Sequence, residues 1–217
     1  MNRRRAILAA AATLLAAAAL SPPATGADLE IAGGLSNASL LGSGVNGGSS
    51  RSGTSFLVEV RWPQGPRFSW RSGLGYVERG MVPGSETYLG PAGAGTVNES
   101  IELAYLEAPL LLGWSPPVHS RTHVTLFAGP AVAFKLSEWL HQTGVQEVKI
   151  KRADFQDEDV LGCVGANVEI PFPARYLFAE ARVDAGLVDV LRPTAASGSA
   201  RTFGMRLLLG YGWFGRH

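Results

Sequence analysis

The strongest constraint on this chain is an alternation of apolar with small or charged side chains at every second position, which recurs between Glu99 and Trp213. A period of two indicates a β-strand, because successive side chains of a strand point to opposite faces. The clearest segment runs from Thr202 to Trp213 and places on one face Phe203, Met205, Leu207, Leu209, Tyr211 and Trp213, and on the other Gly204, Arg206, Leu208, Gly210 and Gly212. A face of small residues and isolated charges is typical of the filled interior of a membrane β-barrel.

The alternation divides the chain into eight candidate strands that form one domain. These are Asp28 to Leu41, Thr54 to Trp62, Arg67 to Val82, Glu99 to Trp114, Thr122 to Leu136, Asp159 to Pro171, Arg175 to Val188 and Arg201 to Trp213. None is a long apolar helix, and each has the length of a tilted barrel strand. The sequence therefore predicts an all-β fold, an eight-stranded antiparallel up-and-down transmembrane barrel over residues 28–217.

The connections between these segments alternate in length. The short ones are Pro63 to Pro66, Ser115 to Arg121 and Phe172 to Ala174, and the long ones are Gly42 to Gly53, Pro83 to Asn98, Ser137 to Glu158 and Leu191 to Ala200. Outer-membrane barrels have tight periplasmic turns and longer external loops. An even number of strands also leaves both chain ends on the periplasmic side.

The first 27 residues have the organisation of a cleaved signal peptide. A basic start from Met1 to Arg5 precedes an apolar stretch from Ala6 to Leu20, and small residues follow up to Ala27. The alternative, an uncleaved anchor helix, requires about 20 apolar residues, and this stretch is shorter. We therefore expect export and cleavage after Ala27.

Composition agrees with a membrane barrel and argues against some other classes of protein. Removal of Arg3, Arg4 and Arg5 leaves 16 basic residues (19 minus 3) against 18 acidic ones, so a nucleic-acid partner is not expected. The single cysteine, Cys163, is interpreted as a small packing residue. Eight aromatic residues near strand ends are candidates for the interfacial girdles: Trp62, Phe68, Trp70, Trp114, Trp139, Tyr176, Tyr211 and Trp213. The alternative is that they form the core of a soluble β-sandwich.

Three segments resemble the strands of a known family. They are YLEAPLLLGW from Tyr105, LFAGPAVAFKL from Leu126 and FAEARVDAGLVDV from Phe178. In this order they resemble the PorT-type outer-membrane β-barrel domain, whose members are small barrels of the OmpA and OmpX kind. The resemblance covers Glu99 to Phe214 well and implies an eight-stranded barrel. It implies little about function, although one branch of the family assists a secretion system.

The same alternation assigns a set of charged side chains to the barrel interior. A lipid-facing Arg or Lys near the bilayer midplane costs about 2 to 4 kcal/mol, so an inward orientation is strongly favoured. The predicted lumenal charge network consists of Arg71, Glu107, Lys135, Glu169, Glu180, Arg182, Asp184 and Arg206. Eight strands leave an interior that side chains just fill, so we expect a packed ionic lumen and no open pore.

Three strand prolines complicate this picture, because a closed barrel has no free edge where a missing N–H is harmless. We expect Pro109 and Pro130 at bulges or near a rim, and Pro171 at the end of a strand.

Catalytic, metal and cofactor sites are not expected. His119–Ser120 falls in a short turn, and His141 has Ser137 and Glu138 nearby but no serine at a convincing spacing for a lipid-modifying enzyme. The acidic run Asp154, Asp157, Glu158 and Asp159 lacks the glycine-punctuated spacing of a calcium loop, and we interpret it as a solvated loop.

The sequence therefore favours a structural or interaction protein whose function is carried by its external loops. A narrow conduit or carrier for a small or hydrophobic molecule is the alternative, suggested by the Gly- and Ala-rich stretches Leu126 to Phe134 and Leu161 to Val168. A lipid-modifying enzyme is the third possibility. The expected partners are outer-membrane lipids and lipopolysaccharide, the barrel-assembly machinery and an unidentified surface or secretion-system protein, with the barrel itself a monomer.

Cleavage after Ala27 gives the first testable expectation. The mature protein should begin near Asp28 and should fractionate with the outer membrane. N-terminal sequencing of the protein from membrane fractions measures this directly, and recovery of the protein from the soluble periplasm would contradict it.

Overall fold

A computed structural model describes residues 26–43, 48–83, 86–90, 93–117, 122–143, 148–151, 155–191 and 198–215. Most of the predicted signal peptide, residues 1–25, lies outside this range. None of the described residues belongs to a helix of the length and apolarity that crossing a membrane requires.

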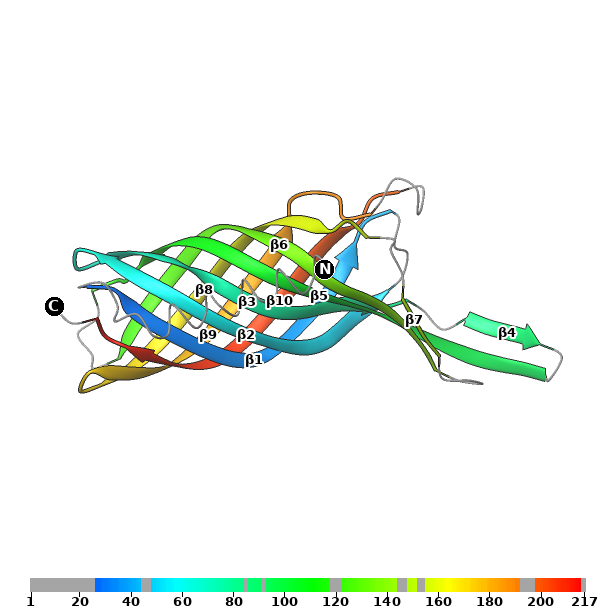
Figure 1. Cartoon of the computed structure of the whole chain (residues 1–217), viewed down its shortest axis with the longest axis horizontal. Coiled ribbons are helices and arrows are strands. Elements are labelled where there is room, and N and C mark those ends of the chain that lie inside the picture. Colours follow the sequence, from blue (N-terminus) through cyan, green and yellow to red (C-terminus); the bar gives the residue numbers. More distant parts are fainter. Residues whose placement is uncertain are drawn as a thin grey trace, which may run out of the picture.

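Eight long antiparallel strands close into a barrel, which confirms the predicted fold (Figure 1). In ring order they are β1, β2, β3, β5, β6, β8, β9 and β10, and β10 pairs again with β1. Their bounds are Asp28–Leu41, Ser49–Gln64, Phe68–Val82, Gly93–Trp114, His123–Thr143, Glu158–Phe172, Arg175–Gly186 and Arg201–Trp213. The end of the barrel that carries the short β2–β3 and β8–β9 connections is here named the turn end, and the opposite end is the loop end.

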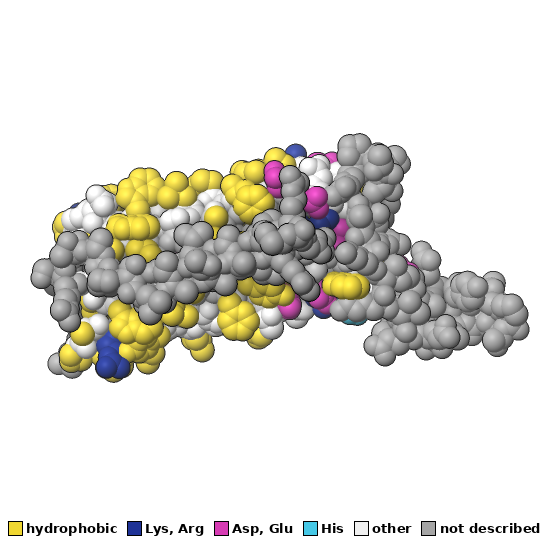
Figure 2. Space-filling model, in the orientation of Figure 1, with side chains coloured by type: hydrophobic (Ala, Val, Ile, Leu, Met, Phe, Trp, Pro, Cys, Tyr) yellow, Lys and Arg dark blue, Asp and Glu magenta, His cyan; other side chains and the backbone are white. Residues whose placement is uncertain are grey.

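The period-two pattern fixes which side chains face outward. In β10 the exposed fraction is 66% for Leu207 and 72% for Leu209. Their chain neighbours Arg206 and Leu208 are almost fully buried. The outward face of the barrel is accordingly apolar, and acidic side chains gather where the barrel body gives way to the loop end (Figure 2). The alternation in this strand therefore has the orientation that the sequence predicted.

Some of the aromatic residues expected in a girdle do form one, at the turn end. Exposed aromatic side chains there are Trp62, Phe68, Trp70, Trp114 and Trp213. Tyr176 is different, because it is fully buried inside the barrel and its hydroxyl donates to Glu30 at 2.7 Å. The expectation that Tyr176 belongs to a girdle is wrong, since its even position in β9 gives it the same orientation as Glu180.

The loop end contains more strand than the sequence indicated. β5 begins at Gly93 and β6 continues to Thr143, so much of the expected loops Pro83 to Asn98 and Ser137 to Glu158 is paired backbone. Two short strands, β4 (Glu86–Gly90) and β7 (Val148–Lys151), pair with the extended parts of β5 and β6. This extension projects beyond the barrel body (Figure 1).

The prolines are accommodated without the expected bulges. The β5–β6 register continues unshifted from Pro109 opposite Ala131 to Leu112 opposite Ala128, and Pro130 lies opposite Gly162 in an unbroken β6–β8 ladder. The one register shift between β5 and β6 is at Ala104, nearer the loop end. Pro171 does lie at a strand end, one residue before β8 stops.

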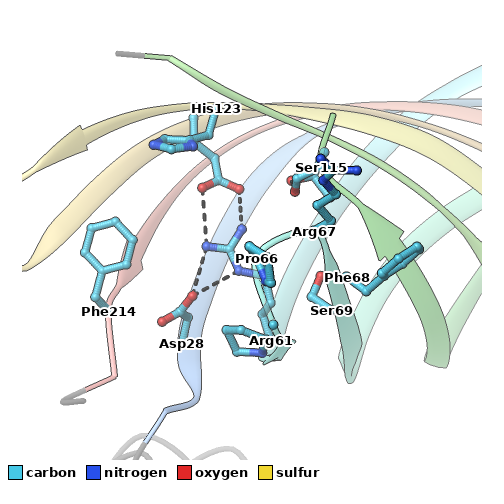
Figure 3. Close-up of a pocket in the computed structure, with 13 residues that line it drawn as sticks. Asp28, Arg61, Pro66, Arg67, Phe68, Ser69, Ser115, His123 and Phe214 are labelled. Carbon is cyan, nitrogen blue, oxygen red and sulfur yellow. Dashed lines mark hydrogen bonds and ion pairs between the residues drawn. The ribbon is translucent and has the colours of Figure 1, made fainter. Parts of the chain in front are cut away.

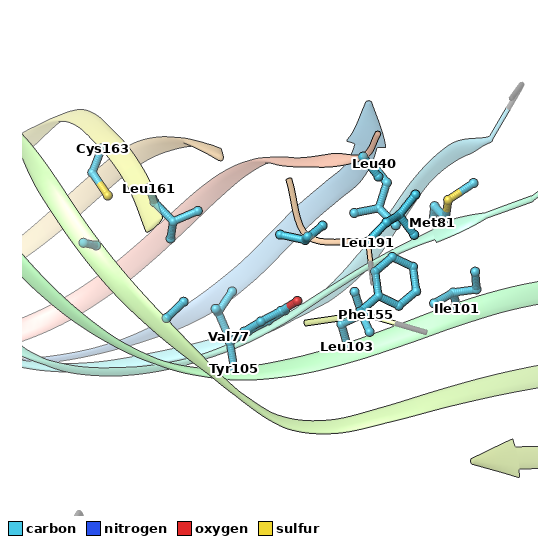
Figure 4. Close-up of a cluster of buried hydrophobic side chains, with 14 of the residues drawn as sticks. Leu40, Val77, Met81, Ile101, Leu103, Tyr105, Phe155, Leu161, Cys163 and Leu191 are labelled. Carbon is cyan, nitrogen blue, oxygen red and sulfur yellow. The ribbon is translucent and has the colours of Figure 1, made fainter. Parts of the chain in front are cut away.

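An apolar plug closes the loop end of the lumen (Figure 4). Phe155, Val190 and Leu191 come from the connections between strands and are at most 7% exposed, in one cluster with inward residues such as Leu103 and Leu161. Phe155 forms a β-bridge with Leu191, and the Gln156 N–H donates to the Val190 carbonyl at 2.7 Å. These connections are therefore partly folded into the barrel mouth.

A carboxylate in the connection after β9 holds this plug in place. Asp189 Oδ1 accepts the backbone N–H groups of Ala200 at 2.9 Å and of Leu191 at 3.0 Å. These two hydrogen bonds keep the pKa of Asp189 below its ordinary value, because they favour the ionised carboxyl group.

The plug predicts a cost for truncating its central ring. Phe155→Ala removes a fully buried aromatic side chain and should lower the free energy of unfolding by about 3 to 5 kcal/mol. The measurement is the heat-dependent gel shift of the barrel in one detergent, with Leu187→Ala as control because Leu187 is 56% exposed. An equal, small effect of both substitutions would show that the loops do not pack into the mouth.

Candidate functional site: the charged lumen

The eight residues predicted for the lumenal network all lie inside the barrel. Seven of them are at most 3% exposed, and the side chain of the eighth, Lys135, is also 3% exposed. Their ion pairs group into three tiers between the turn end and the loop end. The first and middle tiers are linked, because Arg61 lies 3.5 Å from Glu30. Lys135 stands apart beside the plug.

The first tier lies nearest the turn end and centres on Arg61 (Figure 3). The guanidinium Nε donates to Asp28 at 3.0 Å, and Nη1 and Nη2 donate to the two carboxylate oxygens of Glu169. Arg61 also lies 4.9 Å from the centre of the Tyr176 ring, a cation–π distance. One cation is thus shared between β2, β1 and β8.

The middle tier contains two arginines and three carboxylates, and all five side chains are almost fully buried. Arg71 Nη2 lies 2.8 Å from Glu30, 2.8 Å from Glu59 and 2.6 Å from Glu180. Arg182 completes the set, since it donates to Glu180 and Glu59 at 2.9 Å each. Both guanidinium groups also lie near the ring of Phe127, at 4.6 and 5.1 Å from its centre.

The third tier lies below the plug. Arg206 bridges Glu107 and Asp184 at 2.7 Å each, and Arg79 donates to Glu107 and lies 3.6 Å from Asp184. Asp159 belongs to the same tier, because it is fully buried and accepts a hydrogen bond from Thr202 at 2.5 Å. The interpretation of Asp159 as part of a solvated loop is therefore wrong.

Lys135 ties strand β6 to the plug. Its Nζ donates to Glu138 and to the Phe155 carbonyl, both at 2.6 Å. Because Phe155 is the central ring of the plug, this pair fixes the loop against β6.

Each tier contains an ion pair between strands that face one another across the lumen. β3 and β9 are four places apart in the eight-strand ring, as are β2 and β8, and β5 and β10. Arg71–Glu180, Arg61–Glu169 and Arg206–Glu107 therefore cross the full width of the barrel. Side chains that meet across the centre leave no continuous water column in the described lumen.

Each tier carries more acidic than basic groups. The described lumenal tiers contain five guanidinium groups against eight carboxylates, which is one carboxylate more than guanidinium in each tier. The sequence prediction missed six of these thirteen residues: Asp28, Glu30, Glu59, Arg61, Arg79 and Asp159. The period-two pattern could have identified these six residues. Each lies either at an even spacing from another inward charge of its strand or at the start of a strand.

A small pocket opens beside the first tier at the turn end (Figure 3). Its volume is about 180 Å³, and Arg61, Glu169, His123, Thr125 and Phe214 are among its lining residues. The carboxylates that face it already accept hydrogen bonds from Arg61. The pocket can therefore hold a few water molecules, and Arg61 separates it from the middle tier.

The residues considered for catalysis are not brought together. His119 and Ser120 lie outside the described residues. His141 Nε2 lies 3.1 Å from Glu102, which also pairs with Arg51 at 2.8 Å, whereas Glu138 is turned inward to Lys135. Cys163 is buried. Within the described residues, no group of three His, Cys, Asp or Glu side chains could hold a metal ion.

The middle tier predicts a large cost for removing one cation. Arg182→Ala leaves Glu59 and Glu180 short of a partner in a confined interior, and breaking a buried ion pair typically costs about 3 to 5 kcal/mol. Arg201→Ala is the matched control, because Arg201 is exposed at the loop end of β10, and it should cost less than about 0.5 kcal/mol. Heat-dependent gel shifts in one detergent measure both.

A second variant separates charge imbalance from lost packing. Glu59→Gln added to Arg182→Ala should recover part of the loss, since one of the unpaired carboxylates is then removed. Parent-like stability of Arg182→Ala would show that the tier does not support the barrel.

Comparison with solved structures finds small barrels. The chain is 13% identical to Neisserial surface protein A (TM-score 0.48), with 88% of this chain and 97% of that chain covered. It is 11% identical to OprG from Pseudomonas aeruginosa (TM-score 0.44, 89% and 98% covered) and 8% identical to Ail from Yersinia pestis (TM-score 0.43, 86% and 98% covered). Similarities this low say nothing about function.

No curated protein matches the chain. The model of a protein family does match, the outer membrane protein beta-barrel domain, over residues 21–192. This match spans more than half of the 217 residues. The chain therefore belongs to the outer membrane protein beta-barrel domain family, and its place is the outer membrane.

Proposed function

We propose that this protein is a closed, non-catalytic barrel that presents its loop end to the outside as an interaction surface. Within its family we assign it to the PorT type, on the three segments that begin at Tyr105, Leu126 and Phe178. The loop end is then external and the turn end periplasmic, as barrels of this kind have long external connections.

The observation that carries this proposal is that two separate features block the lumen. Three ionic tiers cross the barrel, and the apolar plug around Phe155 closes the mouth above them. A conduit would require water along the axis, and arginines held by two or three carboxylates each are not free to bind a passing solute. Function is therefore left to the outer surface and the external end.

The external end offers an extended element for this role. β5 and β6 are 22 and 21 residues long, whereas the other six barrel strands have 12 to 16. Their extension, widened by β4 and β7, forms an arm that projects from the barrel (Figure 1). The outer edges of such short added strands present backbone groups that a partner strand can pair with.

The partners follow from this placement as proposals. Lipopolysaccharide would surround the arm, the barrel-assembly machinery would insert the chain, and a surface or secretion-system protein would bind the arm of a monomeric barrel. The alternative function, a narrow conduit, is supported by the pocket at the turn end, although that pocket stops at Arg61.

Conductance separates the two functions. The purified full chain in planar bilayers should give no steady current, because the tiers and plug leave no water column. A porin of known conductance reconstituted in the same bilayers is the control. Reproducible single-channel steps would favour the conduit.

Removal of the β4–β5 part of the arm tests the interaction role. Replacing residues 86–97 by Asn-Gly should leave the outer-membrane level and the heat-dependent gel shift unchanged, since these residues lie outside the closed barrel. Cell–cell aggregation and retention of intact cells on mucin-coated and plastic surfaces should fall to the level of cells without the protein. Unchanged retention and aggregation would refute a role for the arm.

The third possibility, a lipid-modifying enzyme, has its own test. A lipid A mass spectrum that differs between cells with and without the protein would point to an enzyme.

A further inference from the structure

A groove lies on the lipid-facing surface of β1, β8, β9 and β10. Its volume is about 580 Å³, and its lining is almost wholly apolar. The outward side chains Ala166, Ala179 and Ala181 are small and form its floor. Neither the charged lumen nor the external arm accounts for this feature.

A ridge of leucines bounds the groove. Leu35, Leu207 and Leu209 are 68%, 66% and 72% exposed, the three highest values for large apolar side chains among the described residues. Leu35 lies opposite Leu207, and Leu207 lies opposite Ala181, so ridge and floor are adjacent. On the other side Val168, 42% exposed, stands opposite Ala179.

A cation lies on the same face of β9, toward the periplasmic end. Arg175 is exposed, and Leu177 lies between it and Ala179 of the groove floor on this face. Its guanidinium lies 5.9 Å from the centre of the Tyr211 ring, which packs edge-on against Trp213 at 4.6 Å. No ion pair with a described acidic side chain holds Arg175 in place. An arginine beside Tyr and Trp at this depth matches the headgroup region of a bilayer.

The spacing between cation and groove matches half a bilayer. Ala179 and Ala181 are four and six residues from Arg175, which is about 13 to 20 Å along a strand at about 3.3 Å per residue. The tilt of barrel strands shortens this along the membrane normal, toward the about 15 Å between headgroup and midplane.

We propose that this surface binds one anionic glycerophospholipid of the periplasmic leaflet, with its phosphate on Arg175 and an acyl chain in the groove. Guanidinium and phosphate are complementary in charge and hydrogen bonding, and the alanine floor lets a chain lie close to the backbone. The proposal rests on the location of the barrel in the outer membrane and not on the role of its arm, so either can fail without the other.

Native mass spectrometry of the full chain in mild detergent tests the site, with phosphatidylglycerol or phosphatidylcholine as the added lipid. The parent should retain one phosphatidylglycerol at about tenfold lower lipid concentration than phosphatidylcholine. Arg175→Gln should abolish this preference, whereas Arg201→Gln, which changes an exposed arginine at the other end of the barrel, should not.

Filling the groove tests the second half of the proposal. Ala179→Leu with Ala181→Leu should reduce retention of both lipids, whereas Ala185→Leu, on the same face of β9 near the loop end, should have no effect. The heat-dependent gel shift checks that each variant is folded. Equal retention of the two lipids by the parent, or no effect of Arg175→Gln or of the double alanine variant, would overturn the proposal. So would a dimer mass that is lost with the double variant, since a second copy would then occupy the groove.

Discussion

The pairing of β1 with β10 is the interaction on which the rest of the structure depends. The hydrocarbon core of a membrane offers no hydrogen bonds, so a sheet can cross it only if its two edge strands satisfy one another. Here they do so without interruption, from Leu29 opposite Trp213 to Leu41 opposite Arg201. Closure converts the alternation of each strand into an inside and an outside, and the inside of eight strands is narrow enough that its side chains have to fill it.

The sequence predicts this closure well, because alternation is a local property. The face of Arg206 or Glu180 follows from its neighbours in the chain, and the structure places both inside. The place of Tyr176 near a strand end predicts a girdle residue, whereas its even spacing from Glu180 indicates the interior, where the structure places it. Position along a strand is therefore weaker information than parity.

Two other features could not be predicted locally. Arg71 and Glu180 are 109 residues apart, and their contact depends on the register of every strand between them. The extension of β5 and β6 falls in segments that the sequence predicts as loops, because these segments lack a sustained period-two alternation of apolar side chains. The plug could not be predicted for a related reason, since Phe155 is a single apolar residue in a polar connection and shows no period-two pattern.

Ionic tiers and apolar plug divide the lumen between two kinds of packing. The tiers are built from strand residues, whose positions the sheet fixes, and they can therefore satisfy the strict geometry of guanidinium–carboxylate pairs. The plug is built from connections, and apolar contacts tolerate their less regular backbone. Lys135 fixes the plug to a strand, since it binds both Glu138 of β6 and the carbonyl of Phe155.

Ion pairs that cross the full width of the ring also constrain how the protein can be assembled. Each of these arginines has one partner on a neighbouring strand, Asp28 for Arg61 and Asp184 for Arg206. The other partner, Glu169 on β8 or Glu107 on β5, is met in no hairpin and in no run of adjacent strands that covers less than half of the ring. A half-built sheet in lipid would expose unpaired charges at a cost of several kcal/mol each. The charges that cross the finished lumen therefore favour insertion that is concerted with closure over strand-by-strand entry into the bilayer.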